Sequence, residues 1–558
     1  MAATKEYIVT LKDYNDLDDF YTQMERSSAE NEEIPSRPCN CCCRREISRN
    51  THYDLTDAEA LELAKDSRVV AVEEPPHKLG IEPIPLWDQT ADFQKNTTTI
   101  SSTDKNWGLF RTVNGASVSN WGNDNTTSHN ATIKTTSSGK NVDVVIVDRH
   151  LASSHPEFAV NADGTGGSRF VNFNWFQYSS ALGYSSNATY SYANGTDSHG
   201  THVAGTVAGN TQGWARDANI YNMEFGGDAG GGNGVSTWTN MLWDYLRHFH
   251  KNKDINPATG RRNPTITNHS WGYVYTTQTV SDVTSVKYRG TTSSVSGSTS
   301  ERQAILEAKG VVCLYGSYLY KMPARVASVD ADVADAIADG VVVIGAAGNS
   351  YWPIDVPSGN DYSNSIFIGS TEYTHTKGMT PAAQTGVICV GSVGSKVAEY
   401  KSTFSNFDER IDVWASGSNI ISAMGTAQDP YAIVYGVNAT DPRDSNYRIA
   451  SISGTSMASP QVTGYIACLA EQEPNLINAS VLQHLIENSK ANVADAGASN
   501  PVQSPNESLG DSPNRWLFYV KKRPDSGVAY PSITQNNRNP TVNGVKFPRS
   551  SSLVTKTV

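Results

Sequence analysis

The stretch Ser453-Gly454-Thr455-Ser456-Met457-Ala458-Ser459-Pro460 decides the interpretation of this chain. It leads into apolar residues at helical spacing, so we expect a helix to begin here, with Pro460 in its first turn. Ser456 would then lie at or just before the helix N-terminus. A free backbone N–H and the positive end of the helix dipole can stabilise a developing oxyanion at that position. An isolated serine there is more often a plain N-cap, so a catalytic role for Ser456 needs partner residues elsewhere in the chain.

Two segments supply candidate partners for Ser456. The first, Val144 to Asp148, is a buried strand that ends in a carboxylate, and sites in open α/β sheets form beyond the carboxyl ends of strands. The second is Asp197-Ser198-His199-Gly200-Thr201-His202-Val203-Ala204-Gly205-Thr206. A zinc protease would need His-Glu-x-x-His on a helix, and the glutamate is missing here. Metal binding by this pair of histidines is therefore disfavoured.

A glycine-rich turn, Gly345-Ala346-Ala347-Gly348-Asn349, follows a further apolar strand at Val341 to Ile344. Taken alone, Asn349 would be an ordinary turn residue. Together, and in the chain order Asp, His, Ser, these segments resemble the subtilisin family of serine proteases. The segments 197–206 and 453–460 are nearly verbatim family motifs. The resemblance covers about residues 105–495 and is interrupted by expected insertions at about 274–330 and 351–385.

The resemblance implies an α/β fold, a subtilisin-like three-layer arrangement with a mostly parallel sheet, and it implies roles for individual residues. Ser456 would be the nucleophile, His199 the general base and then acid, and Asp148 the group that orients the imidazole. Asn349 matches the asparagine of the family's oxyanion hole, with the Ser456 N–H as the second donor. His202 belongs to the motif but is expected to be structural.

Ser270, Trp271 and Gly272 follow a strand at 265–268 and resemble the segment that pairs with extended substrate. In the family this segment also walls the first specificity pocket, and backbone pairing of that kind accepts most sequences. Trp271 and the small residues 346–348 fit an apolar pocket. The floor of the pocket falls in a region too altered to align.

The first eighty residues have their own pattern of strand, helix, polar segment, helix and strand, with a capping box at Thr56 to Glu59. They resemble the family's inhibitor propeptide, a small α+β ferredoxin-like unit that assists folding and is removed by autocatalysis. We expect a propeptide at 1–80, a linker at 81–104, a catalytic domain at 105–495 and a C-terminal extension at 496–558. The segment 106–111 looks like the start of the mature domain, so cleavage is expected between Pro75 and Asp104.

Composition excludes other classes of function. Among 558 residues, 44 are Lys or Arg and 56 are Asp or Glu, which gives a net charge of -12 and no basic stripe for nucleic acid. No apolar run approaches the ~20 residues that cross a bilayer, so neither nucleic acid nor membrane is an expected partner. Charges interrupt the N-terminal stretch, so a removable secretion signal is not expected. The location is left open, and an intracellular or virion-associated protease is conceivable.

The seven cysteines do not indicate a disulfide framework. Four of them lie within residues 39–43, and two interpretations of this cluster remain: a site for a thiophilic metal or a reactive loop. Cys313, Cys389 and Cys468 look like buried thiols. The sequence also carries several Asn-x-Ser/Thr glycosylation patterns, for instance at Asn194 and Asn268.

Two departures from the family pattern bear on activity. Arg149 and His150 stand where the family usually has Ser-Gly or Thr-Gly after the catalytic aspartate. Arg149 could compete with His199 for Asp148, or it could point to solvent. The segment 207–214 is short, so a calcium loop at this point is not expected; no cofactor is required, and calcium elsewhere is possible but not located.

The resulting prediction is a serine endopeptidase that hydrolyses peptide bonds through an acyl-enzyme and is autoprocessed from a proenzyme. Its expected partners are a polypeptide substrate and its own propeptide. Two alternatives keep the same fold. One is a non-catalytic binding or assembly protein, and the other is a protease that cuts only its own propeptide.

Overall fold

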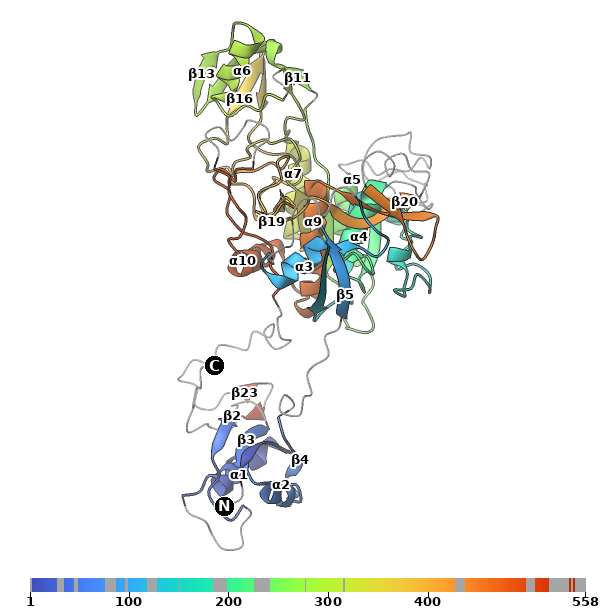
Figure 1. The fold of residues 1–558 in the computed structure, drawn as a ribbon, viewed down its shortest axis with the longest axis vertical. Coiled ribbons are helices and arrows are strands. Elements are labelled where there is room, and N and C mark those ends of the chain that lie inside the picture. Colours follow the sequence, from blue (N-terminus) through green and yellow to red (C-terminus); the bar gives the residue numbers. More distant parts are fainter. Residues whose placement is uncertain are drawn as a thin grey trace. The chain divides into compact units, whose positions relative to one another are not determined.

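The structure, a computed structural model, describes residues 3–27, 35–44, 49–75, 87–95, 99–117, 128–149, 151–183, 198–224, 241–275, 277–314, 317–426, 437–497, 507–520, 541–542 and 545–546. The chain divides into two units (Figure 1). The first comprises Met1–Ile84 with Asp525–Val558, and the second comprises Pro85–Pro524. In the described parts of both units, no helix is long and apolar enough to cross a membrane.

The first unit is a four-stranded antiparallel sheet with two helices. Its sheet order is β2-β3-β1-β4, and its elements are β1 (Lys5–Leu11), α1 (Leu17–Met24), β2 (Cys41–Arg44), β3 (Asn50–Leu55), α2 (Asp57–Leu63) and β4 (Val69–Glu73). The strand alternation of β1 buries Tyr7, Val9 and Leu11. The predicted capping box is present, because Thr56 and Glu59 each accept a hydrogen bond from the other's backbone N–H. A short pair, β23 (Thr541–Val542) and β24 (Val545–Lys546), belongs to the same unit.

The second unit is built on a six-stranded parallel sheet in the order β19-β18-β15-β10-β8-β9. In chain order these strands are β8 (Asp143–Asp148), β9 (Asn219–Glu224), β10 (Thr265–His269), β15 (Val342–Ala346), β18 (Ile388–Val393) and β19 (Val413–Ser416). Every residue of β8 is buried, as expected for a parallel strand covered on both faces.

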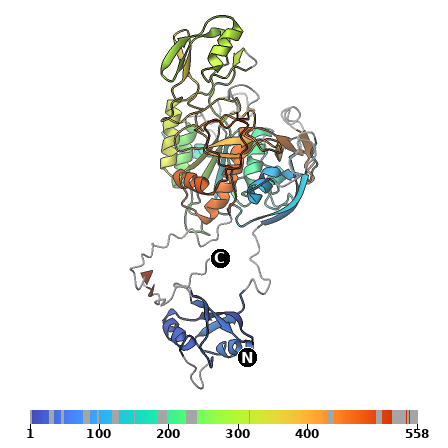
Figure 2. The same cartoon turned by 60° about the vertical axis from the view of Figure 1, so that its left-hand side comes forward.

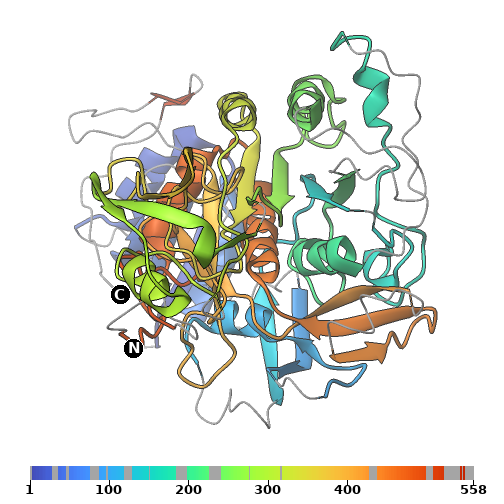
Figure 3. The same ribbon diagram turned by 90° about the horizontal axis from the view of Figure 1, so that it is seen from above.

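Helices cover both faces of this sheet, which makes three layers (Figure 3). Alternate side chains of β8 point to opposite faces. Val144 and Ile146 join a core with α4 (Ser198–Ala208) and α9 (Thr455–Gln472), whereas Val145 and Val147 join a core with α5 (Met241–Asn252) and α7 (Ala327–Ala338). The predicted α/β architecture with a parallel sheet is therefore confirmed for the second unit.

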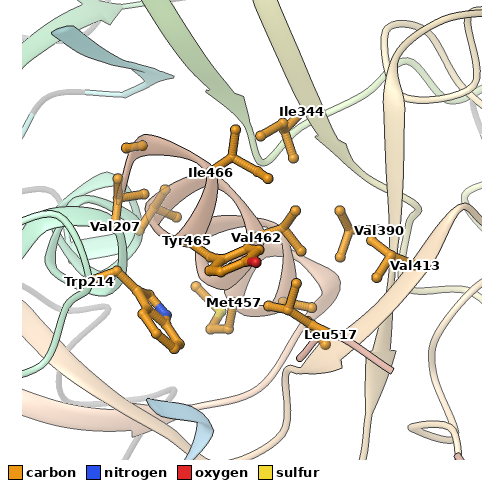
Figure 4. Packing of buried hydrophobic residues seen from close by; sticks show 14 of the residues in the cluster. Val207, Trp214, Ile344, Val390, Val413, Met457, Val462, Tyr465, Ile466 and Leu517 are labelled. Atoms are coloured by element: carbon orange, nitrogen blue, oxygen red, sulfur yellow. The ribbon is translucent and has the colours of Figure 1, made fainter. Parts of the chain in front are cut away.

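Helix α9 is the centre of the larger core (Figure 4). Its Val462 and Ile466 lie against Ile344 of β15 and Val390 of β18, and all four side chains are fully buried. Burial of this kind stabilises the fold by about 1.5–3 kcal/mol for each large apolar side chain. The helix that carries the candidate nucleophile in its first turn is thus packed firmly against the sheet.

The remaining elements surround this framework. They are a sheet of β6 (Lys105–Asn106), β5 (Trp87–Gln94) and β7 (Ser128–Thr135), a sheet of β20 (Ile420–Thr426), β22 (Tyr447–Ile452) and β21 (Val437–Thr440), the helices α3 (Trp107–Asn114) and α10 (Asn478–Asn488), and 3-10 turns at η3 (Pro156–Phe158) and η4 (Trp175–Tyr178). The 3-10 turn η1 (Tyr14–Asp16) belongs to the first unit.

The range expected to be a linker contains strand β5, which is part of the second unit. Phe93 is fully buried in the main core, and Lys95 forms a buried ion pair with Glu399 at 2.8 Å. Arg111 donates to the other oxygen of Glu399, also at 2.8 Å. The Pro-, Thr- and Asn-rich composition of this range did not indicate these contacts, because each contact is made with residues far away in the sequence.

The second unit also extends beyond residue 495, where the C-terminal extension was expected to begin. Residues 515–517 pair with the edge strand β19, since the Trp414 N–H donates to the Arg515 carbonyl and the Leu517 N–H donates to the Trp414 carbonyl. Trp516, Leu517 and Tyr519 are buried in the main core. This segment covers a sheet edge that would otherwise leave unpaired backbone groups.

The two expected insertions pack together in one subdomain. Strand β12 (Val283–Tyr288) of the first insertion pairs with β16 (Ser365–Ile368) of the second, in a sheet ordered β13-β12-β16-β17. Its other elements are β11 (Gln278–Thr279), η5 (Val280–Asp282), β13 (Thr291–Ser294), α6 (Thr299–Glu307), β14 (Tyr318–Leu319) and β17 (Thr371–Thr374). A separate apolar core supports the subdomain, which stands away from the parallel sheet (Figure 2).

The buried carboxylate of Glu157 connects several loops, including the one that follows α4. Glu157 is fully buried, accepts hydrogen bonds from the Thr211 and Gln212 N–H groups at 2.9 and 3.1 Å, and pairs with Arg443 at 2.5 Å. Burial opposes its ionisation. The positive charges of Arg443 and Lys105, together with the Thr211 hydrogen bonds, nevertheless lower the pKa of Glu157 to about 2.

We expect Glu157→Gln to lower the free energy of unfolding by about 3 kcal/mol, the low end for breaking a buried ion pair, because Arg443 keeps Asp441. Since the folded pKa lies below the unfolded one, this stabilisation is present above pH ~4.5 and is lost as the pH falls toward ~2. Denaturant titrations between pH 2 and 7 would measure both effects. The exposed pair member Glu372 offers a control, with a change below ~0.5 kcal/mol for Glu372→Gln. A pH profile of the variant that parallels that of the wild type would contradict the assignment.

Candidate active site

The structure brings Asp148 and His199 together at the carboxyl end of the parallel sheet. Asp148 is the last residue of β8 and is 1% exposed, whereas His199 lies in the first turn of α4. Their Oδ1 and Nδ1 atoms are 3.0 Å apart. This contact fixes the orientation of the imidazole, and it leaves Nε2 as the ring nitrogen that can exchange protons with a substrate or nucleophile.

The Arg149 guanidinium does not pair with the Asp148 carboxylate. Its side chain is exposed, and the contact with Asp148 Oδ1 comes from the Arg149 backbone N–H at 2.8 Å. Of the two alternatives that the sequence left open, the structure favours a guanidinium that points away from the carboxylate. Asp197, His150 and Asn194 lie outside the described residues.

Ser456 is the second residue of α9, in the turn where helix N–H groups have no intrahelical acceptor. Its Oγ donates to the Ser270 carbonyl at 3.2 Å. The expectation that Pro460 lies in the first turn is wrong, since the proline is inside the helix. A proline there cannot donate to the Ser456 carbonyl, and the Ser270 hydroxyl donates to that carbonyl instead, at 3.0 Å.

Asn268 connects the strand before Ser270 to the helix of Ser456. Its side-chain amide donates to Ser270 Oγ at 2.9 Å, and its oxygen accepts from the Ser459 and Thr463 hydroxyls, both at 2.9 Å. Asn268 is fully buried, so the glycosylation pattern noted at this residue is not accessible in the folded protein. The network fixes the segment Ser270 to Gly272 relative to Ser456.

Asn349 lies beside Ser456 with a defined amide orientation. Its Oδ1 accepts from the Thr455 N–H at 2.8 Å and from the Thr455 hydroxyl at 2.7 Å. Because the oxygen takes both donors, the Nδ2 group is on the opposite side and is available to a ligand. The side chain is exposed, as a donor that meets an incoming substrate must be.

A cavity of about 220 Å³ opens next to Ser456. Ser270, Trp271 and Gly272 line one wall, and Ala346, Gly348 and Asn349 line another. Met379 lies between these walls: a Cβ at Gly272 would be 2.3 Å from its sulfur, and a Cβ at Gly348 would be 3.2 Å from its Cε. All three residues of the expected substrate-binding segment therefore line one pocket beside the candidate nucleophile.

His202 and the cysteines do not belong to the pocket beside Ser456. His202 is fully buried, with Nε2 at 2.8 Å from the Ile420 carbonyl, and burial lowers its pKa to about 3. All seven cysteines are free thiols. Within the described ranges, no group of three or more His, Cys, Asp or Glu side chains is arranged to hold a metal ion.

Comparison with known proteins identifies the family. The model of the subtilase family (Peptidase_S8) matches residues 139–503. The chain belongs to the subtilase family. The match includes Asp148, His199, Asn349 and Ser456 and the parallel sheet that carries them. The sequence-based prediction of a subtilisin-like serine endopeptidase is confirmed at this level.

Several proteases are similar to this subtilase. The alkaline proteinase of Hapsidospora chrysogena is 24% identical over 435 residues, which are 76% of this chain and 74% of that protein. Subtilisin DY of Bacillus licheniformis is 26% identical over 363 residues, 64% of this chain and 86% of that protein. An extracellular protease of Xanthomonas campestris pv. campestris is 33% identical over 133 residues, 24% of this chain, and the match spans only 18% of that relative's length.

Among solved structures, a cold adapted subtilisin-like serine proteinase has a TM-score of 0.42 and 19% identity, with coverage of 75% of this chain and 98% of that one.

Sequence reasoning missed several residues that shape the site. Thr455 orients Asn349, and Asn406 holds the turn at 347–352 through bonds to the Ala347 carbonyl at 2.8 Å and the Trp352 N–H at 3.0 Å. Met379 and Lys321 line the pocket from the two insertions. Only Thr455 carried a signal, because it belongs to the motif around Ser456.

Proposed function

We propose that this subtilase hydrolyses peptide bonds with Ser456 as nucleophile, His199 as general base and Asp148 as the group that orients the imidazole. The observation that carries the proposal is the 3.0 Å contact between Asp148 and His199, at the same end of the sheet as the pocket that Ser456 and Asn349 line.

The reaction begins when Ser456 Oγ attacks the substrate carbonyl and His199 Nε2 accepts the hydroxyl proton. Asp148 Oδ1 accepts the Nδ1–H and stabilises the imidazolium. The hydroxyl must leave the Ser270 carbonyl for this step, a rotation about one side-chain bond, and catalytic hydrogen bonds commonly form only in the substrate complex. The imidazolium then protonates the leaving amine, and water releases the acyl group by the same route. Protein groups and water complete this chemistry, so we propose no cofactor for it.

Asn349 Nδ2 and the Ser456 N–H would donate to the oxyanion of the tetrahedral intermediate. We expect Asn349→Ala to lower kcat about 10²- to 10³-fold with little change in KM, because the donor acts mainly on the transition state. This is the size of the effect known for such a donor in subtilisin, a member of the same family. Steady-state kinetics on a peptide anilide would measure it, with the exposed Asn446→Ala as control. Equal losses in both variants, or a loss confined to KM, would rule out this role.

The first unit is proposed to be an inhibitor propeptide. Its order of strand, helix, strand, strand, helix, strand is that of a ferredoxin-like domain. Because β5 is paired with β7 and Lys95 is buried against Glu399, cleavage that leaves the catalytic unit intact must fall before Trp87. The proposed processing site therefore lies between Pro75 and Trp87.

Intact mass and N-terminal sequencing of the purified chain test this proposal. The wild type is expected to begin between residues 75 and 87, and Ser456→Ala is expected to keep its original N-terminus. A folded wild type that remains uncut would contradict self-processing. A cut that also occurs in Ser456→Ala would assign the processing to another protease.

A further inference from the structure

One wall of the pocket is formed by Ser270 to Gly272, opposite the turn at Ala346. The two segments that connect the insertion subdomain to the rest of the unit, 273–275 and 322–324, extend this wall. The Tyr275 N–H donates to the Met322 carbonyl at 2.9 Å, and the Ala324 N–H donates to the Tyr273 carbonyl at 3.0 Å. These bonds form a short antiparallel ladder directly after Trp271 and Gly272. Val274 and Pro323 of the ladder line the pocket, and Lys321 follows at its end.

The backbone at Lys321 is held on both sides. Leu319 and Met322 are fully buried, and the Tyr320 carbonyl accepts from the Trp352 indole N–H at 3.1 Å. Lys321 itself has a φ of 46°, a left-handed conformation that is uncommon for a residue with a side chain. Such conformations persist where the surrounding structure fixes them, often beside functional sites.

Lys321 carries the charge of the pocket. Of the described residues that line it, Lys321 alone has an ionisable side chain. Its ammonium lies 5.1 Å from the centre of the Tyr320 ring, and no described carboxylate forms an ion pair with it. Lys287 of the same subdomain, in contrast, pairs with Glu372 at 3.5 Å.

We propose that Lys321 is a specificity residue that makes this subtilase prefer substrates with a carboxylate side chain, Glu or Asp, immediately before the cleaved bond. The inference rests on the proposed function, because it assigns a substrate class to the pocket beside Ser456. An acidic side chain in this pocket would supply the anion that Lys321 lacks. Lys or Arg in the same position would meet a like charge, which is destabilising in a partly enclosed site. Met379, between the pocket walls, provides an apolar surface for the methylenes of the substrate side chain.

The test compares three peptide anilides that differ only in the residue before the scissile bond: Glu, Gln or Lys. For the mature wild type we expect kcat/KM to be about five- to tenfold higher for Glu than for Gln, as for a single charge-assisted contact, and lowest for Lys. Lys321→Gln should bring the Glu-to-Gln ratio to about one, and Lys321→Glu should make the Lys peptide the best of the three. High salt should reduce the wild-type ratio.

Lys309→Gln is the matched control, because it removes a charge from the same subdomain and Lys309 also lies over a tyrosine ring, at 5.3 Å from the Tyr288 centre. This variant should keep the wild-type ratio. A wild-type ratio below about twofold, or an equal change in Lys321→Gln and Lys309→Gln, would overturn the proposal.

Titration with a serine-directed fluorophosphonate separates this outcome from a failure of the proposed function. A preparation that reacts with the reagent but shows no preference for Glu refutes only the specificity. If nothing reacts, the preference is measured as the relative affinity of Ser456→Ala for Glu and Gln peptides, with the same expected order. Equal affinities would then refute it.

Discussion

Replacing Ser456 by alanine is expected to lower kcat about 10⁶-fold, the scale known for the nucleophile of subtilisin, a member of the same family. The variant loses the atom that forms the acyl-enzyme. The alanine should be tolerated by the fold, because the Ser270 hydroxyl still donates to the residue 456 carbonyl, and that contact does not need the Ser456 side chain. Hydrolysis of a peptide anilide by a chain whose propeptide has been removed in trans would measure the loss.

Ser451→Ala is the matched control for this substitution. Ser451 is 6% exposed, and its buried hydroxyl has no hydrogen-bond partner in the described part of the structure. Activity within about threefold of the wild type is expected, as for a change that touches no catalytic group. If Ser456→Ala, folded to the same melting temperature, kept substantial activity, another nucleophile would have to be found.

Asp148→Asn is expected to lower kcat about 10⁴-fold. The amide would be isosteric with the carboxylate, but it would hold the His199 ring in the wrong tautomer and would not stabilise the imidazolium. The effect should appear in kcat and not in KM, because Asp148 is buried behind His199 and does not line the pocket. Steady-state kinetics with the same anilide substrate would check both parameters.

Arg149→Ser tests whether the guanidinium next to Asp148 affects catalysis. The Arg149 side chain is exposed and contacts Asp148 only through its backbone N–H, which serine retains. We expect less than a threefold change in kcat. A large gain in activity for Arg149→Ser would show that the guanidinium impairs the triad, contrary to the geometry described above.

The sequence singled out the candidate site residues because they lie in short, continuous motifs. Each of these residues lies at the end of an element whose pattern is local. Asp148 ends an apolar strand, Asn349 follows another, and Ser456 lies in the first turn of a helix with apolar spacing. In the sheet, β8 and β15 flank β10, and the Ser456 and Asn349 side chains line one pocket, as expected for residues beyond the carboxyl ends of parallel strands.

The features that the sequence did not predict depend on contacts between distant segments. Lys95 forms an ion pair with Glu399, and the strand at 283–288 pairs with the strand at 365–368. The backbone of Trp516 pairs with the edge strand of the parallel sheet. No periodicity marks such pairs within either segment. The pocket was expected to be apolar on the strength of Trp271 and Ala346. Its charge was not predicted because Lys321 lies in the first insertion, far along the chain from the motifs that mark the other pocket residues.

The most direct test of the central claim is the site of covalent labelling by a serine-directed fluorophosphonate, mapped by peptide mass spectrometry on the mature chain. We expect a single adduct on Ser456, absent in Ser456→Ala and formed far more slowly in Asp148→Asn. A folded, propeptide-free chain that forms no adduct, or forms it on a serine other than Ser456, would contradict the account.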